Sequence, residues 1–168
     1  MTMVLDGSGL TTTGVPNSGT AQASTSGTSI DFTGIPSGVK RITIMLSGVS
    51  TNGSSTLLYQ IGNGSIVTTG YISGGSYQGA AQAGATSTIG FLNGNGGAAA
   101  DATSGITTIT SFGNNTWVSA SVSATTSTNY TYIGGGSKTL SGTLDRVRIT
   151  TVNGTDTFDA GSINILYE

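Results

Sequence analysis

Apolar and polar residues alternate along most of the chain in short runs with a period of two. In residues 39–50, for example, Ile42, Ile44 and Leu46 alternate with polar or charged neighbours, which is the pattern of a strand with one buried face. No stretch repeats apolar residues at helical spacing without interruption by glycine or β-branched residues. The runs that predict strands are residues 29–32, 39–50, 54–61, 85–92, 106–112, 117–124, 129–133, 144–152 and 162–167. The chain is therefore predicted to be all-β, with about nine short strands in a sandwich or barrel.

The predicted strand over residues 117–124 has two unlike faces. Val118, Ala120 and Val122 lie on one face, and Trp117 lies on the other together with three serines. The large aromatic residues in or beside strands are expected in the core; these are Phe91, Phe112, Trp117 and Phe158.

Glycine and Asn-Gly pairs separate the predicted strands. The chain has 28 glycines, and the Asn-Gly pair suits the tight type I′ turn. Asn153-Gly154 is the clearest case and predicts a hairpin between residues 146–152 and 155–158. Residues 134–139 resemble part of a phosphate-binding loop, but Ser137 stands where that motif requires glycine before Lys138. We interpret this stretch as a turn between strands.

Two stretches are too long for tight turns and are predicted as loops, residues 71–84 and 93–105. Tyr71 and Tyr77 lie in the first of these, where exposed tyrosines would suit contact with sugar or protein. The sequence leaves binding and plain packing equally open for both, and they are the candidate surface-contact residues. Residues 1–28 are predicted as an extended N-terminal arm, either loose or laid on a neighbouring subunit, and residues 29–168 as a single β-sandwich domain.

The amino-acid composition argues against a catalytic role. The 168 residues include no histidine, no cysteine and only twelve charged residues, five basic and seven acidic, whereas catalysis draws mainly on such side chains. We therefore expect no enzyme, no cofactor and no metal site. Asp156 and Asp159 beside Asn153 are similar to part of a calcium loop, but two carboxylates fall short of the ligands calcium requires, and turn-forming aspartates are the favoured interpretation.

The same composition bears on partners. Five basic residues cannot assemble a face for nucleic acid. No apolar run approaches the length of a membrane span, and the N-terminus lacks the pattern of a secretory signal. A surface so poor in charge favours burial against further copies of the chain.

Two segments, residues 26–50 and 144–168, together resemble a family of small phage and prophage proteins that occur as free-standing chains and as the distal ends of tail fibres. The resemblance covers both ends of the strand framework and implies a virion protein without catalytic residues. It also implies a homotrimer. Jelly rolls are common in capsid and lectin domains, so the expected fold is a jelly-roll-like antiparallel β-sandwich.

Two positions in the virion follow from this resemblance. The first is a capsid decoration, or cement, protein on the head surface, which contacts the major capsid protein and stabilises the shell. The alternative is a distal tail-fibre or receptor-binding protein whose loops contact host surface glycan. The chain starts at Met1 and shows no heptads or repeats of a fibre shaft, which favours the decoration protein.

Overall fold

The computed structural model describes residues 4–5, 10–11, 16–99, 101–126 and 129–168. Within these ranges the chain forms strands, turns and irregular segments but no helix. Each strand pairing is antiparallel. The all-β prediction is therefore confirmed.

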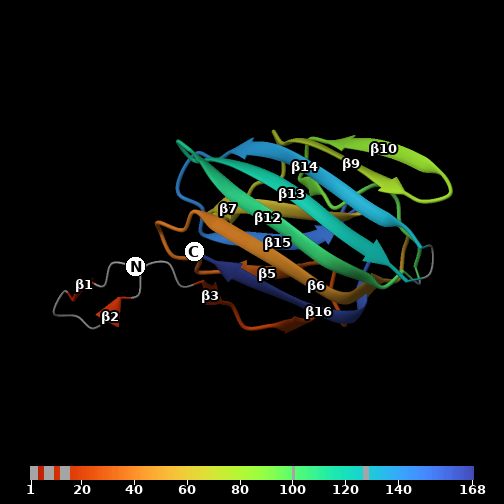
Figure 1. The fold of residues 1–168 in the computed structure, drawn as a ribbon, viewed down its shortest axis with the longest axis horizontal. Helices are drawn as coiled ribbons and strands as arrows, with labels where there is room; N and C mark the ends of the chain where they lie inside the picture. Colours follow the sequence, from red (N-terminus) through yellow and green to blue (C-terminus); the bar gives the residue numbers. More distant parts are fainter. Residues whose placement is uncertain (1–3, 6–9, 12–15, 100, 127–128) are drawn as a thin grey trace.

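The larger of the two main sheets has nine strands and forms one broad, twisted layer (Figure 1). Two short strands share the edge beyond β16, which pairs with both of them. In spatial order the strands are β10 (Gln82–Ser87), β9 (Ile72–Gln78), β14 (Thr131–Thr139), β13 (Thr116–Thr125), β12 (Thr103–Gly113), β6 (Arg41–Thr51), β16 (Phe158–Tyr167), and then β3 (Asn17–Ser18) and β4 (Gln22–Ala23).

The smaller sheet has five strands and packs against the larger one. Its spatial order is β11 (Phe91–Leu92), β7 (Leu57–Asn63), β15 (Arg146–Thr151) and β5 (Ile30–Thr33), with β8 (Ser65–Ile66) also paired to β7. A separate pair, β1 (Val4–Leu5) and β2 (Leu10–Thr11), precedes both sheets.

The hydrophobic core lies between the two sheets. From β6 of the larger sheet, Ile42 and Ile44 are fully buried, and from β15 of the smaller sheet, Val147 and Ile149 are fully buried in the same cluster. The alternation predicted for residues 39–50 is therefore confirmed, because Ile42, Ile44 and Leu46 all point inward. Of the four aromatic residues expected in the core, Phe112 is the exception: its side chain is 80% exposed.

The loop predicted over residues 71–84 is wrong. Half of this stretch forms β9, which pairs with β14 on one side and with β10 on the other, and its last three residues begin β10. The strand predicted over residues 85–92 is divided, since β10 ends at Ser87 and β11 belongs to the other sheet. The sequence pattern did not predict the hairpin of β9 and β10 because these strands are rich in glycine, alanine and serine and carry few large apolar residues.

The turn predicted over residues 134–139 is also wrong, because these residues lie inside β14. Their glycines allow β11 and the segment after it to lie directly on the sheet. A Cβ added at Gly134 would overlap the carbonyl oxygen of Leu92, and one added at Gly75 of β9 would overlap that of Gly94. Here glycine permits close approach of two backbones rather than a change of direction.

The inner face of β13 is the serine face. Ser121 and Ser123 are buried, whereas Val118 and Val122 are exposed. The Ser121 hydroxyl donates to the carbonyl oxygen of Asn93 at 3.1 Å, and the Asn93 side-chain amide donates to the Ser123 hydroxyl at 2.8 Å. Where β13 faces the segment after β11, the two sheets are therefore held together by buried hydrogen bonds between polar groups, because buried polar groups need partners.

The Asn153-Gly154 pair forms a turn but not a hairpin. Gly154 has a φ of 68° and its amide donates to the carbonyl oxygen of Thr151. The strands on either side belong to different sheets, β15 to the smaller and β16 to the larger, so the predicted hairpin is wrong. A tight hairpin instead joins β12 to β13, where Asn114 and Asn115 both have positive φ, as a type I′ turn requires.

The predicted N-terminal arm lies on its own chain over part of its length. Here β3 and β4 pair with β16, and Ser24 is fully buried, its hydroxyl donating to the carbonyl oxygen of Ala160 at 2.7 Å. This part of the arm is thus neither loose nor laid on a neighbouring subunit. Residues 1–3, 6–9 and 12–15 of the arm lie outside the described residues.

Candidate interaction surface

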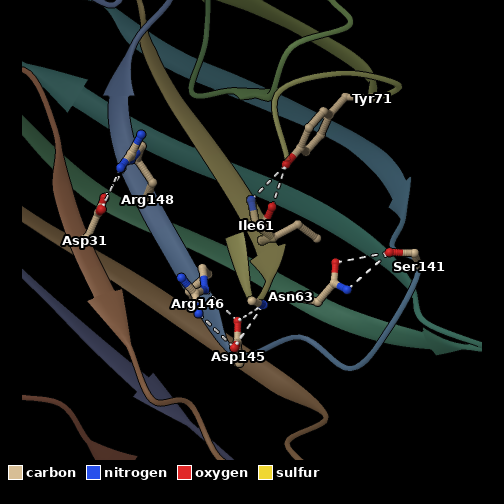
Figure 2. A network of polar contacts seen from close by, with 9 residues as sticks. Asp31, Ile61, Asn63, Tyr71, Ser141, Asp145, Arg146 and Arg148 are labelled. Carbon is tan, nitrogen blue, oxygen red and sulfur yellow. Dashed lines mark hydrogen bonds and ion pairs between the residues drawn. The ribbon is translucent and has the colours of Figure 1, made fainter. Parts of the chain in front are cut away.

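Tyr71 lies in the core, so the expectation of an exposed tyrosine at this position is wrong. Its side chain is 2% exposed, and its ring meets that of Phe91 edge-on at 5.0 Å. The hydroxyl reaches the backbone of β7, where it accepts from the Ile61 amide at 2.8 Å and lies 3.2 Å from the Ile61 carbonyl oxygen (Figure 2). It also donates toward the carbonyl oxygen of Val67, at 2.9 Å, in the segment after β8. Burial raises the pKa of Tyr71 to about 12. Tyr71 therefore serves packing.

Tyr77 lies at the other end of β9 and has a different environment. Its ring stacks on that of Tyr130, with centroids 4.6 Å apart and an angle of 18° between the planes, and its side chain is half-buried. Strand geometry places Tyr71 and Tyr77 about 20 Å apart along the strand, so the two residues do not share a site. Contact of Tyr77 with a partner stays a prediction.

Most of the basic side chains are held in ion pairs. On the outer side of the smaller sheet, Arg148 of β15 forms two parallel hydrogen bonds to Asp31 of β5, at 2.8 and 2.7 Å, and Arg146 binds Asp145 in the same way (Figure 2). At the beginning of β6 in the larger sheet, Arg41 pairs with Glu168. Three of the five basic residues therefore have carboxylate partners.

The Asp145 carboxylate also ties the start of β15 to the turn after β7. Both of its oxygens accept from the Gly64 amide at 3.1 Å. The hydrogen bonds from Arg146 lower the pKa of Asp145, and the Gly64 amide adds to this lowering against a partial opposing effect of burial. The carboxylate is thus held charged by its neighbours, which makes it a structural ion pair rather than a proton donor near neutral pH.

The aspartates beside Asn153 also hold local structure. Asp156 accepts from the Ser55 amide at 2.9 Å, and Asn153 accepts from the amides of Thr155 and Asp156. Among the described residues no group of three or more His, Cys, Asp or Glu side chains is placed to hold a metal ion. The described residues also contain no helix with the length and apolar character needed to cross a membrane.

The outer face of the larger sheet carries a group of exposed aliphatic side chains, which we call the apolar face. Its members are Ile72 of β9, Ile106 of β12, Val118 and Val122 of β13 and Ile133 of β14. Ile106, Val122 and Ile133 are direct cross-strand neighbours and form one row. Ile72 and Val122 are 76% and 60% exposed.

The apolar face carries no charge. Across β9, β12, β13 and β14 the one charged residue is Lys138, whose amine lies 5.4 Å from the centre of the Tyr71 ring, on the inner side of the sheet. Small or neutral residues such as Ala120, Ala124 and Thr108 fill the rest of this face. The alternation in residues 117–124 indicated two unlike faces, but it did not indicate which of them is covered.

These observations place the candidate site on a broad, uncharged surface rather than in a cleft. Comparisons with protein-family models, with curated proteins and with solved structures each find no match to this chain.

Proposed function

We propose that this chain is a bacteriophage virion structural protein that works by assembly and not by catalysis. Its proposed position is the head surface, as a trimeric, jelly-roll-like capsid decoration protein that contacts the major capsid protein and stabilises the shell. The observation that carries the proposal is the apolar face, because its row of adjacent aliphatic side chains, Ile106, Val122 and Ile133, is exposed to water, and contiguous apolar surface of this kind often marks contact with another protein.

The two segments that resemble phage proteins form one structural unit in this fold. Residues 26–50 contain β5 and all but the last residue of β6, and residues 144–168 contain β15 and β16. In the structure β5 pairs with β15 in the smaller sheet, and β6 pairs with β16 in the larger. The resemblance therefore covers the strands around the core, which supports applying it to the fold as a whole.

The ion pairs join the same two segments. Arg148 pairs with Asp31, and Arg41 pairs with Glu168, so each pair links one segment to the other. With most basic side chains held in this way, little positive charge is left for phosphate groups, which supports the expectation of no nucleic-acid partner.

Imaging of intact phage particles tests the position in the virion. Particles with and without this gene would be compared by electron microscopy, and the copies per particle counted by quantitative mass spectrometry. We expect many copies on the head, and loss of the protein should make heads release DNA at a lower temperature. Density at the fibre tip, or a few copies per particle, would contradict the decoration role.

The alternative is a distal tail-fibre protein that contacts host surface glycan. The half-buried Tyr77 and Tyr130 stack favours it, since aromatic rings with exposed edges suit contact with sugars or proteins. Its test is adsorption: purified protein should block attachment of the phage to host cells, and Tyr77→Ala should weaken this effect. Release of sugar from host polysaccharide would overturn both proposals in favour of an enzyme.

A further inference from the structure

The apolar face needs a partner that is itself uncharged. Its four strands present aliphatic, hydroxyl, glycine and alanine residues to solvent, and the ion pair of Arg41 with Glu168 lies at the border of the face, where Arg41 of β6 is opposite Thr110 of β12. Burying a charge against such a surface costs free energy without compensation. A second copy of this chain supplies a surface that meets the requirement, because it carries the same uncharged face.

The shape of the face also suits packing against itself. The row formed by Ile106, Val122 and Ile133 protrudes as a ridge. A shallow, open depression lies beside Val122 toward Ala124, and another lies beside Ile133 over the glycines of β9 and β14. The face therefore contains both protruding side chains and shallow hollows, which suits interdigitation with the same surface on neighbouring copies around an axis.

The size of the face is close to the lower end of specific interfaces. Its strands β9, β14, β13 and β12 have 7, 9, 10 and 11 residues, and with about 4.8 Å between strands and about 3.3 Å per residue they cover about 590 Å². Specific interfaces begin at about 600 Å² on each partner. The face can therefore contribute most of a small interface.

We propose that this chain associates with further copies of itself through the apolar face, with Val122 near the centre of the contact. The inference deepens the proposed function and rests on it for the number of copies, since the expected homotrimer would turn this face toward its axis. Association is then driven by burial of aliphatic surface and not by charge, so added salt should not weaken it.

A matched pair of variants tests the proposal. Val122→Glu places a charge in the centre of the apolar face, whereas Val152→Glu places the same charge at a valine that is 40% exposed on the turn after β15. Light scattering coupled to size-exclusion chromatography should give three times the monomer mass for the wild type and for Val152→Glu. For Val122→Glu we expect a threefold lower mass with an unchanged circular-dichroism spectrum.

Thiol labelling gives a second measurement that does not depend on adding a charge. Because the chain has no cysteine, Val122→Cys and Val152→Cys each introduce a single thiol. In the assembled protein, the thiol at position 122 should react with a maleimide at least tenfold more slowly than the thiol at position 152. Equal rates in a protein shown to be oligomeric would overturn the proposal.

The outcomes separate this inference from the proposed function. An oligomer that survives Val122→Glu means that copies join elsewhere, which overturns the inference but not the proposal of a trimeric virion protein. Loss of the oligomer in Val122→Glu, combined with absence of the protein from purified virions, supports the inference and contradicts the proposed function. A wild type that is monomeric at every concentration overturns the inference.

Discussion

Replacing Tyr71 by phenylalanine removes one hydroxyl group from the core and leaves the ring in place. The ring keeps its edge-on contact with Phe91. The Ile61 amide, however, loses the acceptor that lies 2.8 Å away, and the carbonyl oxygen of Val67 loses its donor at 2.9 Å. Because Tyr71 is almost completely buried, solvent cannot replace the lost hydroxyl without opening the core.

The expected cost follows from the groups that are left without partners. A buried backbone group that loses its hydrogen bond costs about 1–3 kcal/mol, so we expect Tyr71→Phe to lower the free energy of unfolding by about 2 kcal/mol. For a chain of this size, each kcal/mol corresponds to about 2–4 °C in Tm. The variant should therefore melt about 4–8 °C below the wild type.

Urea denaturation followed by circular dichroism measures this difference, with the slope m expected to be unchanged. Tyr77→Phe is the matched control, because it removes the same hydroxyl from a half-buried ring at the other end of β9. It should change the free energy of unfolding by less than about 0.5 kcal/mol. Equal stabilities for Tyr71→Phe and the wild type would refute the assignment of this hydroxyl as a bridge to β7.

The same pair gives a pH test. Folding raises the pKa of Tyr71 from 10.0 to about 12, so the unfolded chain loses this proton first and stability falls as pH rises between these values. At pH 11 this titration should lower the free energy of unfolding of the wild type by about 1 kcal/mol. The phenylalanine variant has no such group, so the difference in stability between the two proteins should become smaller as pH rises. Burial also raises the pKa of Tyr59, but Tyr59 is present in both proteins and cancels. A difference in stability between wild type and Tyr71→Phe that grows with pH would contradict a buried, neutral hydroxyl at Tyr71.

Three further predictions concern the polar layer and the smaller sheet. Gly134→Ala should cost about 3 kcal/mol because its Cβ would overlap the Leu92 carbonyl, whereas Gly74→Ala, on the open face, should stay within about 0.5 kcal/mol by thermal melting. Asn93→Leu should cost about 2–3 kcal/mol in urea, since the hydroxyls of Tyr59 and Ser123 lose their partner; an unchanged midpoint would exclude this role. The lowered pKa of Asp145 stabilises the fold above pH about 4. The difference in Tm between wild type and Asp145→Asn should therefore vanish as pH falls through the folded pKa, and a constant difference would contradict the ion pair.

Local sequence pattern was sufficient for the strands around the core. In residues 39–50 the alternation of Ile42, Ile44 and Leu46 predicts both the strand and its buried face, because one side of β6 meets the smaller sheet along its whole length. The all-β class follows in the same way, from many short runs with a period of two and no helical spacing. Positions and bounds of β12, β13 and β15 were predicted to within a few residues for the same reason.

The candidate interaction surface was not predicted, because alternation reveals two faces but not which of them is covered. In β13 the serines point inward, since Asn93 arrives from a distant part of the chain and satisfies their hydroxyls. The valines are consequently left outside. Composition had already indicated self-association through a surface poor in charge, but it could not locate that surface.

The sequence alone thus determined the period of the strands around the core, the turn at Asn153-Gly154 and the scarcity of charge, all of which depend on residues close together in the chain. Only the tertiary structure decided that Tyr71 is buried, that Gly134 lies in a strand and that Val122 faces outward. Each of these depends on a segment remote in sequence: the β7 backbone for Tyr71, Leu92 for Gly134 and Asn93 for the serine face of β13. Long-range partners of this kind leave no signal in the local pattern of apolar and polar residues.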